Sequence, residues 1–158
     1  MDSHAVLGLG FKKIIDMPPF WLLGLAALAY FLGALLTPWG APAVIRWLGW
    51  LALLAGAGLM AAAIIEFRRK GTTVIPHAEP THLVTTGVYQ YSRNPIYLAD
   101  ALILAGLCLI WGAWAGLLLV PVFVVLIEKR FIQPEEARLR AGFGAEFAAW
   151  AGRTRRWI

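Results

Sequence analysis

Hydrophobic residues form long runs along this chain, and charged residues stand at the ends of the runs. No charged residue occurs between Asp16 and Arg46. Within that stretch, the run from Phe20 to Leu36 predicts a first membrane-spanning helix. At a rise of 1.5 Å per residue this run would be about 25 Å long, which is short but sufficient with anchors at the membrane interface.

A second apolar run, from about Val44 to Phe67, predicts a second spanning helix. A turn rich in proline and glycine precedes it at residues 37–42, and three basic residues follow it: Arg68, Arg69 and Lys70. Basic residues at the end of an apolar run are typical of a helix that leaves the membrane on its cytoplasmic side.

Two shorter apolar runs follow a polar connection from Lys70 to Asn94. The third run extends from Pro95 to Trp111, and proline is a common first residue of a helix. After a turn at Gly112, the fourth run extends from Ala113 to Ile127. Both runs are near the lower length limit for a span, so tilted helices and a partly inserted hairpin both remain open.

The tail from Phe131 to Trp150 has the pattern of an amphipathic helix that lies along the membrane surface. The fold class predicted from all these runs is an all-α integral membrane protein. It would have about four transmembrane helices plus a C-terminal amphipathic surface helix. The length of the chain fits a single domain that covers residues 1–158.

Composition supports a membrane protein. Hydrophobic residues make up 60% of the chain and charged residues 15%, respectively above and below the usual share in soluble domains. The net charge of +5 alone could indicate a nucleic-acid partner. Because the basic residues stand at the ends of apolar runs, we expect contact with lipid headgroups and no nucleic acid. Cys108 is the only cysteine, which excludes an intrachain disulfide and a cysteine-rich metal site.

The basic residues also predict an orientation. With four spans, all but Arg46 would lie on one side of the membrane: Lys12, Lys13, Arg68, Arg69, Lys70, Arg93, Lys129, Arg130, Arg138, Arg140, Arg153, Arg155 and Arg156. The positive-inside rule makes that side cytoplasmic, together with both termini. Asp16 and two prolines follow the first lysines without a cleavage pattern, so we expect the first apolar run to be retained. We expect a bacterial inner-membrane protein.

Two polar stretches would lie at the same membrane depth. The first is LVTTGVYQYSRNPIYLAD, residues 83–100, and the second is RFIQPEEARLRAGFGAEF, residues 130–147. They are far apart in the sequence, but both lie at the predicted cytoplasmic ends of helices. One site at the membrane surface could therefore be built from both.

These two stretches, with the closing RTRRWI, resemble the integral-membrane methyltransferase family. That family includes isoprenylcysteine carboxyl methyltransferases and phospholipid N-methyltransferases. The isoprenylcysteine branch has His where this chain has Asn94, and Asn before the proline is similar to the phospholipid branch. The resemblance implies methyl transfer from S-adenosylmethionine and a cofactor-binding part at about residues 49–158. The cofactor-binding residues that it implies are Arg93, Asn94, Pro95, Tyr97, Glu135 and Glu136, and also Gly56 and Gly58 in the second apolar run.

The chemistry of S-adenosylmethionine fits these residue types. The guanidinium of Arg93 can pair with its carboxylate in a bidentate fork. The glutamates can accept hydrogen bonds from its ribose hydroxyls or its amino group. Tyrosine rings can pack on adenine or face the sulfonium. The tyrosines available for this are Tyr89, Tyr91 and Tyr97.

Each of these residues also has a structural interpretation. Arg93 could extend its charge to the lipid headgroups and help to set the membrane orientation. The two glutamates could simply begin a surface helix. The tyrosines could belong to an interfacial belt, and the two glycines could serve close helix packing. His77 and His82, with Glu79 between them, could suggest a metal. Prolines interrupt that run and no third ligand is evident, so we expect no metal.

Asp100 is the remaining candidate. It lies about one turn beyond Tyr97, so both side chains would project from one face of the third helix. A carboxylate at the start of a membrane helix is a functional hypothesis by default. Its alternative role is as an ion-pair partner of Arg93 or Arg130. The candidate catalytic residues are therefore Asp100, Glu135 and Arg93.

The sequence predicts a methyltransferase that acts on a lipophilic acceptor at the cytoplasmic membrane face. The acceptor could be a phospholipid amine or an isoprenylcysteine-like carboxylate, and the sequence leaves oxygen, nitrogen and sulfur acceptors open. The alternative is a non-enzymatic membrane module that binds a small ligand or assists assembly. A transporter subunit fits less well, because the runs lack paired intramembrane charges and a broken-helix repeat.

Overall fold

A computed structural model of the chain describes residues 17–37, 39–71 and 82–158. These parts contain helices and no strand. The α-helices are α2 (Pro18–Leu36), α3 (Ala43–Arg69), α4 (Pro95–Trp111), α5 (Leu119–Ile127) and α6 (Gln133–Arg153). Two short 3₁₀ helices, η1 (Gly87–Gln90) and η2 (Trp114–Leu118), and a π-helical turn, η3 (Glu128–Ile132), complete the chain. The possible metal ligands His77 and Glu79 lie outside the described residues.

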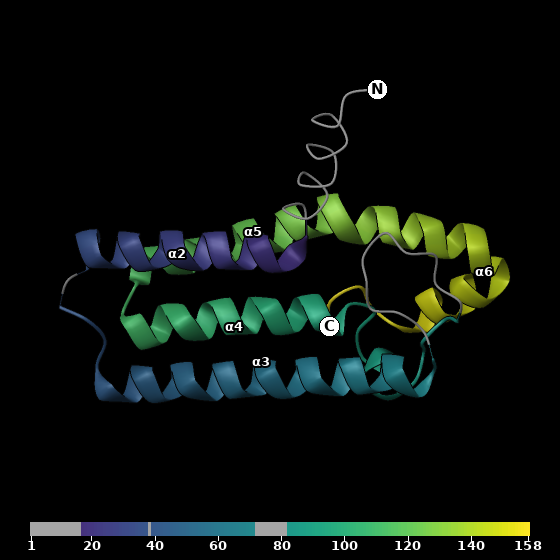
Figure 1. Cartoon of the computed structure of the whole chain (residues 1–158), viewed down its shortest axis with the longest axis horizontal. Coiled ribbons are helices and arrows are strands. Elements are labelled where there is room, and N and C mark those ends of the chain that lie inside the picture. The colour runs from purple at the N-terminus through teal and green to yellow at the C-terminus, as the bar shows by residue number, and fades with distance from the viewer. Residues whose placement is uncertain (1–16, 38, 72–81) are drawn as a thin grey trace, which may run out of the picture.

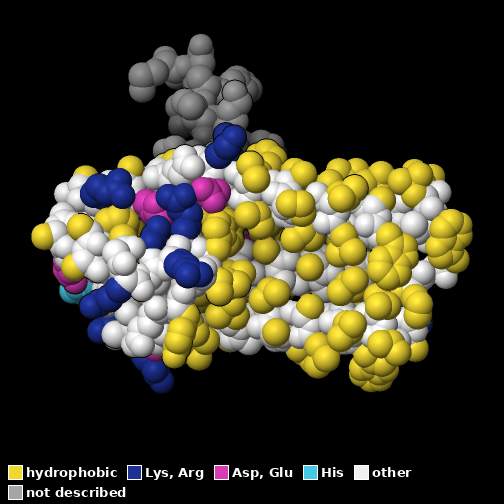
Figure 2. All heavy atoms as spheres, turned by 180° about the vertical axis from the view of Figure 1, so that it is seen from behind, with side chains coloured by type: hydrophobic (Ala, Val, Ile, Leu, Met, Phe, Trp, Pro, Cys, Tyr) yellow, Lys and Arg dark blue, Asp and Glu magenta, His cyan; other side chains and the backbone are white. Residues whose placement is uncertain are grey.

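The helices α2, α3, α4 and α5 lie side by side and alternate in direction (Figure 1). The start of α2, the end of α3, the start of α4 and the end of α5 therefore lie at one end of the bundle. Helix α6 and the C-terminus lie at this same end (Figure 1). We call it the polar end, because charged side chains gather there, while hydrophobic side chains cover the rest of the face seen in Figure 2.

Two of the described helices, α2 and α3, are long and apolar enough to cross a membrane. Helix α4 is apolar but shorter, at 17 residues. Large side chains on both long helices face outward, among them Phe31, Leu35 and Trp47. An exposed apolar surface of this extent indicates contact with lipid. The prediction that four segments cross the membrane remains a prediction.

Helix α4 packs most extensively against α3, and glycines make this contact close. A Cβ on Gly56 would lie 2.9 Å from the carbonyl oxygen of Ala99, and a Cβ on Gly106 would lie 2.8 Å from that of Gly49. Small residues at such positions let two membrane helices approach each other. Gly58 faces the other way, since a Cβ there would meet nothing within 4 Å.

The sequence pattern suggested one helix for the fourth apolar run, but the structure divides this run into two helices. Gly112 ends α4 in a left-handed conformation with φ of 68°, which glycine adopts without steric cost. The next residues form the 3₁₀ helix η2, and regular α-helix begins only at Leu119. Pro121 lies in the first turn of α5, where a missing N–H is tolerated.

No loop separates α5 from α6. The chain continues from one helix into the other through the π-helical turn η3. Helix α6 then bends at Gly144, whose φ of 45° and ψ of −113° are not helical. Beyond the bend, Phe147 and Trp150 are buried in a small apolar cluster with Tyr89 and Ala63. A helix thus covers the range expected for the amphipathic tail, while its position along a membrane surface stays a prediction.

Candidate active site

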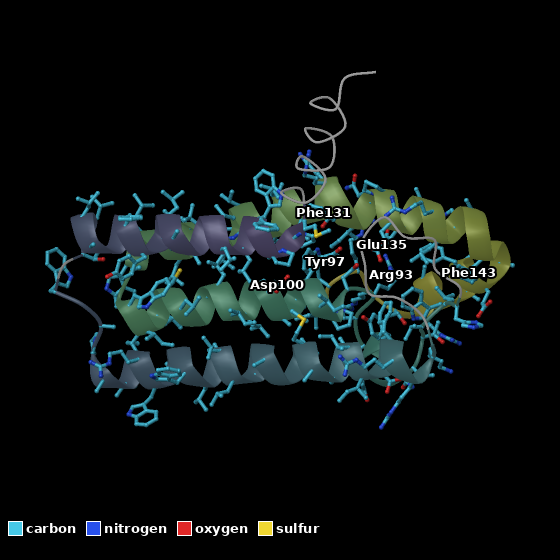
Figure 3. All side chains as sticks on the ribbon, viewed as in Figure 1. Arg93, Tyr97, Asp100, Phe131, Glu135 and Phe143 are labelled. Carbon is cyan, nitrogen blue, oxygen red and sulfur yellow. The ribbon has the colours of Figure 1, made fainter. Side chains whose placement is uncertain are left out.

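The two polar stretches of the sequence meet at the polar end of the bundle. Arg93 and Asn94 directly precede α4, whose first residue, Pro95, is buried. Glu135 and Glu136 lie in the first turn of α6. Figure 3 shows Arg93 and Glu135 at this end of the molecule, next to the start of α4. The prediction that these stretches lie near one another is therefore confirmed by contacts between their side chains.

Arg93 is bound on all sides by the protein. Its Nε and Nη2 donate hydrogen bonds of 3.1 and 3.0 Å to Oε1 of Glu136. Its Nη1 donates to the carbonyl oxygens of Ala151, at 3.1 Å, and Thr154. These bonds occupy the guanidinium edge that would otherwise form a fork with a ligand carboxylate. Direct contact between Arg93 and a cofactor remains a prediction.

A second arginine, Arg156, completes this arrangement from the C-terminal tail. Its Nε and Nη2 donate to the two oxygens of Glu136 at 3.1 and 2.7 Å, and its Nη1 donates to Glu128 at 2.6 Å. The indole of Trp157 donates to the other oxygen of Glu128 at 2.9 Å. We call Arg93, Glu128, Glu136, Arg156 and Trp157 the outer network.

Backbone groups of the tail also hold the stretch before α4. The backbone N–H of Arg93 donates to the carbonyl oxygen of Arg155 at 2.9 Å. The side-chain amide of Asn94 donates to the carbonyl oxygen of Arg156 at 3.0 Å. The hydroxyl of Ser92 accepts a hydrogen bond from the backbone N–H of Asn94. Asn94 therefore fastens the tail to the start of α4.

A second group of polar side chains lies deeper, between α4 and the start of α6. The hydroxyl of Tyr97 donates to Oε2 of Glu135 at 3.3 Å. Asp100 is only 5% exposed, and none of the described residues forms a hydrogen bond or ion pair with it. Figure 3 shows Tyr97 and Asp100 along α4, with Glu135 close to Tyr97. We call Tyr89, Tyr97, Asp100 and Glu135 the inner cluster.

The two adjacent glutamates differ in their electrostatics. Burial raises the pKa of Glu135 above its usual value, and the hydrogen bond from Tyr97 and the charge of Arg138 oppose this effect only in part. Burial also acts to raise the pKa of Glu136, but the hydrogen bonds and charges of Arg156 and Arg93 outweigh it, so that pKa is lowered. Neighbouring carboxyl groups whose pKa values are pushed apart are suited to different tasks.

The three candidate tyrosines have different surroundings. Tyr89 is buried with its ring edge-on to Phe67, and its carbonyl oxygen accepts a hydrogen bond from the indole of Trp150. Burial raises the pKa of the Tyr89 hydroxyl, and the charge of Glu135 raises it further, which links Tyr89 electrostatically to the inner cluster. Tyr91 is 78% exposed.

The sequence did not identify three members of the outer network as site residues: Glu128, Arg156 and Trp157. Two signals were present. Glu128 is the first acidic residue after the long fourth apolar run, and the closing RTRRWI combines basic residues with an aromatic one. Neither signal says which charge pairs with which. Among the described residues, no group of three His, Cys, Asp or Glu side chains could hold a metal ion.

A comparison with known protein families identifies the chain. The sequence model of the family described as phospholipid methyltransferase matches residues 44–146. The chain belongs to the phospholipid methyltransferase family. The match covers α3 from its second residue, α4 and α5, the whole first polar stretch and the second one up to residue 146. No curated protein and no solved structure matches the chain.

Membership confirms the family that the two polar stretches suggested. It shows a membrane methyltransferase in general terms, and it implies lipid substrates. The matched residues end before the tail that carries Arg156 and Trp157. The outer network therefore joins residues inside the match to residues outside it.

Proposed function

We propose that this phospholipid methyltransferase uses S-adenosylmethionine to methylate the amine of a lipid at the cytoplasmic membrane face. The observation that carries the proposal is Asp100, a nearly enclosed carboxylate without a partner among the described residues. Such a group is costly in an apolar setting and is retained where it meets a cation. A lipid ammonium supplies that cation, whereas a carboxylate acceptor would be repelled.

The inner cluster also fits the methyl donor. Its members are two carboxylates and two tyrosines, and S-adenosylmethionine carries a sulfonium and an ammonium group. When bound, it supplies a methyl group already activated by the sulfonium. Glu135 would accept a hydrogen bond from its amino group or ribose, and the rings of Tyr97 and Tyr89 would face its cationic part. These two tyrosines and Glu135 are our proposed direct contacts.

The other residues implied by the family resemblance would act mainly by holding the inner cluster in position. Arg93 and Glu136 bind each other, and Asn94 binds the tail. Pro95 begins α4, and Gly56 lets α3 approach α4 beside Ala99. Gly58 faces away from that contact, and we propose no donor contact for it.

Asp100 has a defined role in this reaction. An ammonium nitrogen has no free electron pair, so a lipid amine must lose a proton before it can attack a methyl group. The carboxylate of Asp100 would hold the ammonium, accept one proton from its nitrogen and pass that proton on to water. The amine pKa is near that of lysine, about 10.4, so a nearby anion and a route for the proton are both needed.

The proposed membrane arrangement has four spans, with the polar end in the cytoplasm. Single-cysteine labelling tests it in a Cys108→Ala background, because Cys108 is the only native thiol. Arg153→Cys, at the polar end, should react only from the cytoplasmic side of sealed vesicles. Trp39→Cys, which is at the opposite end and 78% exposed, should react only from outside. Labelling of position 153 from outside would reject the orientation.

Two measurements test the proposed function. Calorimetry on the purified protein should show binding of S-adenosylmethionine, and mass spectrometry after incubation with labelled donor should show a methylated lipid amine. Label on a lipid carboxylate instead would reject the amine. Donor binding without any methylated product would favour the non-enzymatic alternative.

A further inference from the structure

The C-terminal tail lies beyond the matched family region, yet it supplies Arg156, whose side chain binds the carboxylates of both Glu136 and Glu128. We propose that Arg156 is a positioning residue of the donor site. It holds Glu136 on the side of the C-terminal tail, and it thereby directs Glu135 toward Tyr97 in the inner cluster. This inference rests on the proposed function.

The geometry of Glu136 supports this role. Oε2 of Glu136 accepts from Arg156, and Oε1 accepts from both Arg156 and Arg93. The residue is 7% exposed, so rotation of its carboxylate would break several charge-assisted hydrogen bonds inside the protein. Successive residues on an α-helix are about 100° apart. Once Glu136 is held on one side, the direction of Glu135 is therefore set.

A second contact fixes Arg156 itself. Its Nη1 is 2.6 Å from Glu128, which also accepts the indole N–H of Trp157. Glu128 begins the π-helical turn and Glu136 follows it in α6, so Arg156 joins the two sides of that turn. The tail thus holds α6 in a fixed orientation relative to α5, across the irregular turn between them.

The chain offers a matched control for this role. Arg155 carries the same charge next to Arg156, but its side chain is exposed and only its backbone carbonyl takes part, accepting from the N–H of Arg93. Arg156→Gln and Arg155→Gln remove equal charge from the same tail. Arg156→Lys keeps the charge but replaces the planar fork by a single ammonium.

The first measurement is the affinity for S-adenosylmethionine by calorimetry from about pH 4, near the usual glutamate pKa, to about pH 8. Arg156→Gln should weaken binding roughly tenfold to a hundredfold and should move the acidic limb of the affinity profile to higher pH, because Glu136 loses its strongest partner. Arg156→Lys should recover part of the loss. Arg155→Gln should bind like the parent, with an unchanged profile.

The second measurement needs no bound donor. Hydrogen exchange at the backbone N–H of Arg93, which is bonded to the tail, should become faster in Arg156→Gln and stay slow in Arg155→Gln. If the parent does not bind S-adenosylmethionine at all, the proposed function fails, while this measurement still decides whether Arg156 holds the tail in place.

Three results would overturn the inference. The first is equal behaviour of Arg156→Gln and Arg155→Gln in both measurements. The second is a uniform loss of affinity at every pH with no movement of the acidic limb, which would reduce Arg156 to a general stabilising residue. The third applies if Arg156→Gln fails to fold: Arg156→Lys would then carry the test, and parental affinity in that variant would reject the need for the fork.

Discussion

The outer network and the inner cluster lie side by side at the polar end, and they differ in how their charges are balanced. Glu136 accepts hydrogen bonds from two arginines, and Arg156 also pairs with Glu128. In the inner cluster, Glu135 has the hydroxyl of Tyr97 as its hydrogen-bonding partner within the described residues. Asp100 has none there.

This difference separates structural charges from charges available to a ligand. A buried pair whose bonds are satisfied holds its surroundings in place but has little capacity left for another molecule. Carboxylates without a cation are unfavourable until a cation arrives. Both groups draw on the same two polar stretches, and within the described residues Asp100 and Glu135 are their carboxylates without a basic hydrogen-bonding partner.

Asp100→Asn, in the inner cluster, should have the largest effect on activity. The substitution keeps the size of the side chain but removes the anion that would hold an ammonium and take its proton. We expect turnover of a lipid amine to fall roughly tenfold to a thousandfold, while donor affinity changes only a few-fold. Both should be measured on the same preparation.

Glu146→Gln provides the control for this substitution, because Glu146 is an exposed acid on α6. It loses the same charge and should keep parental turnover. Unchanged turnover in Asp100→Asn would remove Asp100 from the mechanism. A collapse of donor binding would instead assign Asp100 to the donor site.

Glu136→Gln should break the outer network and lower the melting temperature of the purified protein. It leaves two arginines without their shared anion, and we expect a loss of about 2–3 kcal/mol, moderated because Arg156 is one-third exposed. The neighbouring change Glu135→Gln should leave the melting temperature nearly unchanged but weaken donor binding. Equal melting temperatures of the two variants would contradict the distinction between the two groups.

The same pair of variants predicts opposite pH effects. The pKa of Glu136 is lowered, so its contribution to stability is present above its usual pKa, about 4.3, and is lost as the pH falls through the lowered value. The pKa of Glu135 is raised, so its stabilising contribution is present below the usual value and is lost as the pH rises through the raised one. Glu136→Gln should therefore flatten the acidic limb of a melting-temperature profile, and Glu135→Gln should not.

Tyr97→Phe should have the smallest effect. It removes one hydrogen bond of 3.3 Å to Glu135 but keeps the ring, so donor affinity should fall by roughly fivefold, equivalent to about 1 kcal/mol. Calorimetry would measure this loss. Tyr91→Phe, at an exposed position, should have no effect. A loss of donor affinity there as large as in Tyr97→Phe would reject the assignment of Tyr97 to the donor site.

The long helices could be predicted from the sequence because their signals are local. The expected run from Phe20 to Leu36 became α2, Pro18–Leu36, and the run that begins at Pro95 became α4 with the same bounds. The fourth run was harder, since apolar character alone does not distinguish a 3₁₀ helix from an α-helix. The π-helical turn also has no hydrophobic signature.

The direction of individual side chains depended on tertiary contacts. Tyr89 and Tyr91 are two residues apart, yet one is buried against Trp150 and the other is exposed. Gly56 and Gly58 are also two residues apart and face opposite sides of α3. The pairing of the tail with the glutamates could not be predicted, because it requires the bend in α6 that returns the chain to α4.

The π-helical turn η3 has a consequence for how sequence changes are tolerated. A π-helical turn holds one residue more than the α-helical geometry around it would. Deleting one residue there, such as Lys129, would turn the segment into regular α-helix with the flanking helices nearly in register, whereas the same deletion inside regular α-helix would rotate everything after it by about 100°. Glu135 and Glu136 should then keep their separate partners, Tyr97 and Arg156. The five-residue segment between α5 and α6 is therefore the part of this continuous helix that should best tolerate the loss of one residue.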